Sequence, residues 1–276
     1  ERWGLFDDPS LLAPFYFRAL RRHARRFPGY VPLLSSVGRS LGTVLRRFGL
    51  DDFAPFRVYL DALCQITVQC SAEEAEAPFA LATMDYYFRG TGHVRGGIGE
   101  LAHALVRAIE TCGGEVRLAS RVKALERHPG WWRADTRRGP VFAEHAIANL
   151  LPQDVRRLLG AEEGALPALD ARARRVEEGW GAAMLYLVAA APPGAGPEAH
   201  HLELVPDPSA PFVEGHHLFV SISGADDAGR AAPGHRTLTV STHVPMAHLR
   251  SLSREVQGRY IAEVQDRMRA GLARLA

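Results

Sequence analysis

The chain has 276 residues, 47% of them hydrophobic, and a formal net charge of +2. This length fits one large domain or two intertwined ones, with enough apolar residues for a substantial core. The small net charge gives no sign of nucleic-acid binding, and the longest apolar run, residues 182–191, is too short to span a bilayer. Cys64, Cys70 and Cys112 lack metal or redox spacing, so we expect reduced thiols in a cytoplasmic protein.

Both ends of the sequence suggest a longer protein. The chain begins at Glu1, without an initiator methionine, and closes at Ala276 inside a helical pattern. Apolar residues recur at helical spacing up to that end, and no stop signal follows them. We therefore expect a fragment of a longer protein. The apolar residues of this last helix are Val256, Tyr260, Val264, Met268, Leu272 and Leu275.

Residues 9–90 show a helical pattern with short breaks. The first helix has an arginine-rich face opposite an aromatic and aliphatic face. A surface helix with its apolar side on the core fits this pattern, and a helix lying in a membrane interface is the alternative. Residues 35–48, 53–70 and 72–84 predict further helices. The arginines of the first helix are Arg18, Arg21, Arg22, Arg25 and Arg26.

Residues 90–126 carry a glycine-rich loop, an amphipathic helix, a Gly-Gly stop and strand signals. We expect the helix to bury one face, because its apolar residues recur at helical spacing. Gly113 and Gly114 should end it, since glycine adopts the left-handed conformation without a Cβ clash. Strands are expected at residues 115–118 and from Val122 onward. The apolar face consists of Ile98, Leu101, Ala102, Leu105 and Ile109.

The loop before this helix is the best candidate for cofactor contact. A glycine loop that opens a helix lets backbone N–H groups approach a phosphate or a flat ring closely. Gly97, Gly99 and Ala102 match G-x-G-x-x-A, but no buried strand precedes them and residues 115–118 do not end in an acid. The spacing is therefore more typical of a helix start packed close to another backbone than of a dinucleotide fingerprint.

Strand signals dominate the rest of the chain, apart from a short helix from Pro152 and the last helix. The order of helices, mixed unit, meander, strands and helix indicates an α+β fold rather than an alternating α/β wrap. Turns at 129–130 and 138–139 make the first three strands a meander. The expected strands are 121–127, 131–136 and 141–143 in the meander, 146–150 after it, and 183–189, 201–205, 217–223 and 236–243 near the end.

Several familiar catalytic arrangements are missing from the sequence. There is no G-x-S-x-G elbow and no H-E-x-x-H motif. The pairs His200-His201 and His216-His217 do not indicate a metal site, because neighbouring residues on a strand point to opposite faces. Asp226 and Asp227 are assigned to a turn. A hydride-transfer flavoenzyme can dispense with such machinery, because its cofactor carries the chemistry.

Three segments resemble the phytoene desaturase family, within the wider amine-oxidase-like FAD superfamily. The first has a Gly-Gly loop, a helix and GGE before the meander, and the second returns with an Asn and a Pro. The third resembles the turn between two strands that carries D-x-x-x-AP-x-G in the family, and here the spacing runs from Asp227 to Ala232, Pro233 and Gly234. The resemblance covers roughly residues 50–276. The segments are RGGIGELAHALVRAIETCGGEVRLASRVKALE at 95–126, AIANLLPQDVRRLLG at 146–160, and LFVSISGADDAGRAAPGHRTLTVSTHVP at 218–245.

The resemblance implies FAD as the cofactor and a part of an FAD/NAD(P)-binding α/β fold. It implies that Val122 meets the adenine through its backbone and that Asn149 and Pro152 close the site. The family's N-terminal strand with G-x-G-x-x-G is absent, as is its C-terminal glycine-rich segment. Both would lie outside this fragment, which would not hold FAD tightly and would be inactive alone. The residues implied near the flavin are Arg95, Gly96 and Gly97.

The resemblance also implies an oxidoreductase acting on an apolar isoprenoid polyene, as a desaturase, saturase or isomerase. The alternatives are a flavin amine oxidase or porphyrinogen oxidase relative, and a non-catalytic membrane-surface module. No catalytic residue is assigned, although His93 or Arg95 is the first place to look for an acid or base. Membrane contact would be peripheral, on the inner face, and the oligomeric state stays open. Core packing is the default for the aromatic side chains of residues 53–88, and lining of the substrate channel is the alternative; they are Phe56, Tyr59, Tyr86, Tyr87 and Phe88.

We expect three regions along the chain. Residues 1–90 would form a helical, membrane-proximal part of the substrate domain. Residues 91–160 would form a partial FAD-binding domain that carries the meander. Residues 161–276 would supply the substrate-domain strands and the last helix.

Overall fold

The structure, a computed structural model, describes residues 35–90, 92–192 and 194–275. Within these ranges the chain is α+β, as predicted, with two separate antiparallel sheets. The arginine-faced first helix lies outside the described residues. No described helix is long and apolar enough to cross a membrane.

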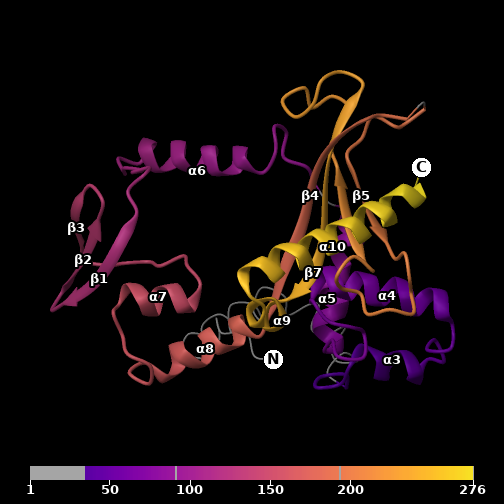
Figure 1. Cartoon of the computed structure of the whole chain (residues 1–276), viewed down its shortest axis with the longest axis horizontal. Coiled ribbons are helices and arrows are strands. Elements are labelled where there is room, and N and C mark those ends of the chain that lie inside the picture. The colour runs from indigo at the N-terminus through magenta and orange to yellow at the C-terminus, as the bar shows by residue number, and fades with distance from the viewer. Residues whose placement is uncertain (1–34, 91, 193, 276) are drawn as a thin grey trace, which may run out of the picture.

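The four-stranded sheet and the last helix form one well-packed unit (Figure 1). The strands follow the order β4-β7-β6-β5, with β4 at Trp180–Ala190, β5 at His200–Leu204, β6 at Leu218–Ile222 and β7 at His235–Pro245. Helix α10, Arg254–Leu272, lies across one face, and α9, Met246–Ser251, joins it to β7. All four predicted strands are confirmed. The unit ends in a short 3-10 turn, Ala273–Leu275.

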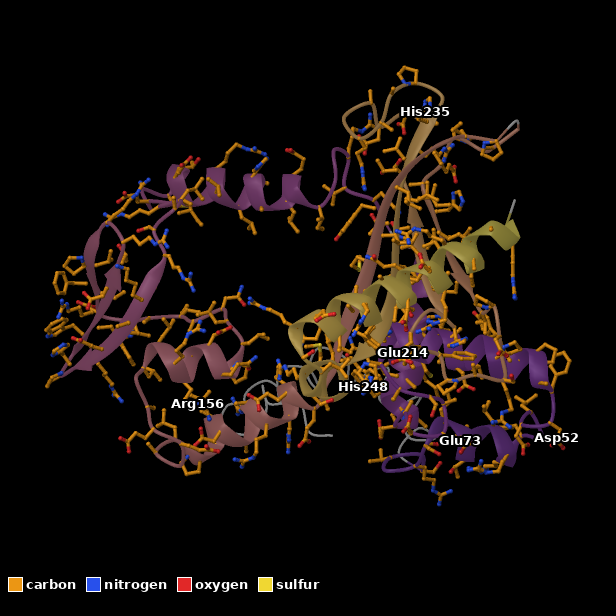
Figure 2. The ribbon with its side chains drawn as sticks, in the orientation of Figure 1. Asp52, Glu73, Arg156, Glu214, His235 and His248 are labelled. Atoms are coloured by element: carbon orange, nitrogen blue, oxygen red, sulfur yellow. The ribbon has the colours of Figure 1, made fainter. Side chains whose placement is uncertain are left out.

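Alternation along the strands explains this packing, because successive side chains point to opposite faces. Leu218, Val220 and Val240 are 0% exposed and pack with Val264 and Met268 of α10. The helical stripe predicted near the C-terminus is therefore confirmed over its central part. The hydroxyl of Tyr260 on α10 donates to the Glu214 carboxylate, which Figure 2 labels beside this helix.

A cluster of three helices lies at one end of this sheet (Figure 1). They are α3, Leu41–Arg47; α4, Ala54–Thr67; and α5, Ala77–Arg89, in the regions that the sequence predicts as helical. Ser40 caps α3 by accepting from the Thr43 N–H at 3.2 Å. Cys64 of α4 is 0% exposed, and burial raises the pKa of its thiol to about 12. None of the three cysteines forms a disulfide.

Residues 92–178 form an arm that leaves the four-stranded sheet and returns to it (Figure 1). Helix α6, Gly99–Thr111, leads away, and the three-stranded sheet lies beyond its far end. The strands are β1, Val122–His128; β2, Trp131–Thr136; and β3, Gly139–Ala143, which confirms the predicted meander. Helices α7, Pro152–Leu158, and α8, Pro167–Glu177, lead back. The sequence predicts α7 but not α8.

The Gly-Gly stop after α6 is confirmed. The Cys112 N–H donates to the Ala108 carbonyl at 3.0 Å, and the Gly114 N–H donates to the Ile109 carbonyl at 2.8 Å. Gly113 has φ +80°, the left-handed conformation that glycine adopts most easily. A Cβ at Gly114 would approach the Ile109 carbonyl oxygen to 3.0 Å. Local backbone geometry therefore favours glycine at both positions.

The predicted burial of one α6 face is wrong. Among its apolar residues, Ile98 is 75% exposed, Leu105 58% and Leu101 51%, and no α6 residue is buried. The helical spacing is present, but no described segment packs over this face. The apolar pattern therefore marks a surface that requires a partner which the described chain does not provide.

The strands predicted at residues 115–118 and 146–150 are also wrong. No backbone–backbone hydrogen bond joins either segment to another described residue. Leu118 is 76% exposed and Ile147 is 97% exposed. Both segments have strand-like sequences, but a strand forms only beside another strand that satisfies its N–H and C=O groups.

Candidate functional site

The glycine loop before α6 forms a tight turn at residues 94–97. The Gly97 N–H donates to the Val94 carbonyl at 2.9 Å. Gly96 and Gly97 have φ angles of +80° and +99°. Side chains with a Cβ rarely adopt these angles, so the turn requires glycine at both positions.

A turn that lies more than 130 residues later in the sequence forms hydrogen bonds with this loop. The carboxylate of Asp227 accepts from the Gly96 N–H, with its two oxygens at 3.1 and 3.0 Å. Arg95 pairs with Asp226 at 3.3 Å, but these side chains are 79% and 68% exposed, so the pair adds little stability. An open depression of about 410 Å³ lies over this junction. Its lining residues are Arg95, Gly96, Glu100, Asp226, Asp227, Ala228 and Gly229.

The sequence predicts only a turn at Asp226 and Asp227 and does not predict this contact. The signal was present, since Asp227 opens the turn of the third resembling segment. The contact also changes the expected role of Gly96, because its N–H already has a carboxylate partner. A phosphate would have to compete with Asp227 for that donor.

A stack of aromatic rings joins the same loop to the four-stranded sheet. His93 lies on His201 of β5, with ring centroids 4.7 Å apart and Nε2 atoms 3.1 Å apart. His201 in turn stacks on Phe219 of β6, with centroids 5.1 Å apart. Burial lowers the pKa of His201, and the nearby His93 and His200 lower it further. The loop thus rests on the face of the sheet that does not contact α10.

That face is rich in polar and titratable side chains. Strand pairing places His201 opposite Ser221, Glu203 opposite Phe219, and Phe219 opposite Ser241. Since Val220 and Val240 face the core, these residues line the other side of the sheet. We call His201, Glu203, His217, Phe219, Ser221, Ser241 and His243 the polar sheet face.

Two histidines extend this face toward β7. The His217 side chain is 1% exposed, with Nε2 at 3.5 Å from a Glu203 oxygen, and it stacks on Phe212. Burial lowers the pKa of His243, as does the nearby His217. The Nδ1 atoms of both rings are buried without a protein partner. No group of three His, Cys, Asp or Glu side chains suited to a metal ion occurs among the described residues.

The structure divides the site residues implied by the resemblance into two groups. Arg95, Gly96 and Gly97 lie together before the N-terminus of α6. The others follow its C-terminus, and α6 is roughly 20 Å long at 1.5 Å per residue. Val122 begins β1 opposite Thr136, where the register is irregular; Asn149 is exposed, and Pro152 is the first residue of α7.

Of the residues expected near a substrate, Phe56 and Tyr59 stack with ring centroids 6.3 Å apart, and Tyr59 is 51% exposed. The side chains of Tyr86, Tyr87 and Phe88 lie outside the described part of the structure.

No protein-family model and no curated protein sequence matches the chain. Four chains of solved structures match it. One is the crystal structure of a protein described as "Putative protoporphyrinogen oxidase" from Exiguobacterium sp. 255-15, with 19% sequence identity and a TM-score of 0.39. The match covers 75% of this chain and 41% of that protein, so the chain spans less than half of its length.

Proposed function

We propose that this chain is part of an FAD-dependent oxidoreductase. The supporting observation is the contact between Gly96 and Asp227. The two residues belong to separate segments that resemble the family. Strand, helix or turn propensity alone does not predict that they are in contact. Their hydrogen bonds at 3.0 and 3.1 Å join the loop that would lie beside the flavin to a substrate-domain turn.

The residues present fit an extended dinucleotide. Arg95 to Gly97 precede α6 and Val122 follows it in the chain, so the length of this helix would separate a flavin end from an adenine end. Val122 would contact the adenine through its backbone, and Arg95 to Gly97 would lie beside the flavin ring. Asn149 and Pro152 would close the site. Bound FAD would accept a hydride from the substrate.

FAD binding on this proposal requires further polypeptide. The α6 face and the segments 115–118 and 146–150 expose apolar side chains, and both segments lack backbone partners. A hydrophobic strand beside these segments would satisfy both needs and complete the sheet that holds the dinucleotide. This surface therefore supports the expectation of a fragment.

The first candidate substrate is an apolar isoprenoid polyene, which follows from the family that the sequence resembles. For such a substrate the protein would supply an apolar channel and alignment with the flavin. A peripheral membrane location would suit this lipid-soluble molecule.

The polar sheet face favours a second candidate, a planar substrate with polar groups, as in porphyrinogen or amine oxidases. Two histidines, a glutamate and two serines of this face are partly exposed and offer hydrogen bonds that a hydrocarbon cannot use. The ring stack of His93, His201 and Phe219 offers a flat surface beside them.

The test is to purify the product of the whole reading frame and record its visible spectrum before and after unfolding. We expect flavin absorption bands and release of FAD on unfolding. A stably folded, colourless product that takes up no added FAD would overturn the proposal and favour a non-catalytic module.

Anaerobic mixing then separates the substrate classes, because hydride transfer bleaches the flavin bands. Coloured isoprenoids and porphyrinogens should be compared at equal concentration. If the polar sheet face binds the substrate, Glu203→Gln should slow bleaching by the polar substrate. The same change should leave bleaching by a polyene unchanged.

A further inference from the structure

The loop of residues 92–98 is held to the sheet at two points that differ in chemistry. At one point the Asp227 carboxylate accepts from the Gly96 N–H. At the other, Nε2 of His93 meets Nε2 of His201 at 3.1 Å. Aspartate carboxylates in general titrate near pH 4, whereas histidine titrates near about pH 6.5, so only the second point changes protonation around neutrality.

The distance between the two Nε2 atoms restricts their protonation. At 3.1 Å one nitrogen must accept while the other donates. A neutral imidazole has one acceptor nitrogen, but a protonated ring has none. Two protonated rings would place two N–H donors and two positive charges against each other, so the contact cannot persist in that state.

The surroundings favour the neutral form of His201. His200 is its neighbour on β5, and both His93 and His200 disfavour a charge on it, as does its partial burial. Among the charged groups around the loop, Arg95 pairs with Asp226, and Asp227 accepts from backbone. The side chains of Glu100 and Arg230 also lie close to Gly96 and Gly97. Glu203, on the same face, lies beside His217.

We propose that His93 and His201 form a pH-sensitive latch on the glycine loop. The latch is closed while at least one ring is neutral and opens when both rings are protonated. Its consequence rests on the proposed function, because the loop carries Arg95 to Gly97, which would lie beside the flavin. Acid would then remove one of the two contacts that hold these residues, so the remaining contact between Gly96 and Asp227 would open more often.

The direction of the pH effect follows from linkage. The pKa of His201 is lowered in the closed state, so closure is fully favoured above the ordinary histidine pKa of about 6.5 and weakens as the pH falls below it. Each unit by which closure lowers that pKa changes the ratio of closed to open loop by about tenfold.

Amide hydrogen exchange of the chain without cofactor measures the latch directly. The Gly96 N–H is the reporter, since its hydrogen bond to Asp227 is the second contact that holds the loop and should open more often once the histidine contact is lost. After correction for intrinsic exchange, its protection should fall severalfold between about pH 8 and about pH 5. An unchanged protection factor would overturn the proposal.

Matched variants assign the effect to the two rings. His201→Phe keeps a ring between His93 and Phe219 but cannot titrate, so the pH dependence should disappear. His93→Phe should do the same if His201→Phe fails to fold. His200→Phe changes the neighbouring residue on the opposite face and should retain the pH dependence.

If either folded latch variant retains the full pH dependence, the proposal is wrong. None of these measurements requires flavin or substrate, so their outcome is independent of whether the proposed oxidoreductase activity exists.

Discussion

The four-stranded sheet unit and the α6 arm contain similar apolar patterns but bury them very differently. In the sheet unit, Leu218 and Val240 are 0% exposed under α10. In the arm, Leu105 is 58% exposed and Ile147 is 97% exposed. The difference is that α10 is supplied by the chain itself, whereas no described segment covers α6. Periodicity thus shows that a face needs a partner but does not show where the partner lies.

The largest predicted effect contrasts equivalent substitutions in the two regions. Leu218→Ala should lower the free energy of unfolding by about 2–5 kcal/mol, because it opens a cavity beneath α10. Leu101→Ala, on the 51% exposed α6 position, should change it by less than about 0.5 kcal/mol. Urea denaturation measures both. Equal losses would show that α6 is packed as tightly as the sheet.

Substitution of a buried arginine in the sheet unit should have the second-largest effect on the free energy of unfolding. Arg236 is 4% exposed, and its guanidinium donates to the carbonyls of Gly196, Glu198 and Ser223. Arg236→Met should cost about 1–3 kcal/mol, because these carbonyls lose their donor. The control is Arg107→Met on the exposed side of α6, which should be near neutral. A stable Arg236→Met protein would refute this structural role.

The contact between Gly96 and Asp227 joins the two regions, and its loss should change hydrogen exchange only near the glycine loop. Asp227→Ala removes the acceptor of the Gly96 N–H, a contact worth about 1 kcal/mol, so exchange of that amide should rise about fivefold. Asp226→Ala breaks only an exposed ion pair and should have a smaller effect. Equal exchange in wild type and Asp227→Ala would mean that the loop is held by other contacts.

The smallest effect on stability concerns the uncovered face itself. Leu105→Glu should leave the free energy of unfolding within about 0.5 kcal/mol of wild type. It should nevertheless reduce binding of an apolar fluorescent dye and any self-association, because it places a charge on the exposed stripe. A large loss of stability would instead indicate that this face is buried.

Local sequence signals predicted most of the fold. Alternating residues and turn glycines located the meander and four strands, and the Gly-Gly stop ended α6 correctly. The predictions failed at residues 115–118 and 146–150, where structure depends on a neighbouring strand rather than on local propensity. The polar sheet face was missed for a related reason. His201 meets Phe219, and His217 meets Glu203, only through strand register, which a single sequence does not specify.

The site residues themselves stay a prediction. The resemblance selected the loop at Arg95 to Gly97, and the structure shows why two glycines are needed there. It did not reveal that Asp227 occupies the Gly96 N–H or that His93 reaches His201. Both contacts join segments more than 100 residues apart.

The most direct test of this account is amide hydrogen exchange at residues 115–118 and 146–150 in the FAD-loaded product of the whole reading frame. If further polypeptide completes a flavin-binding sheet, these amides should be protected as strongly as those of β6. Exchange as rapid as in the present chain alone would contradict that conclusion.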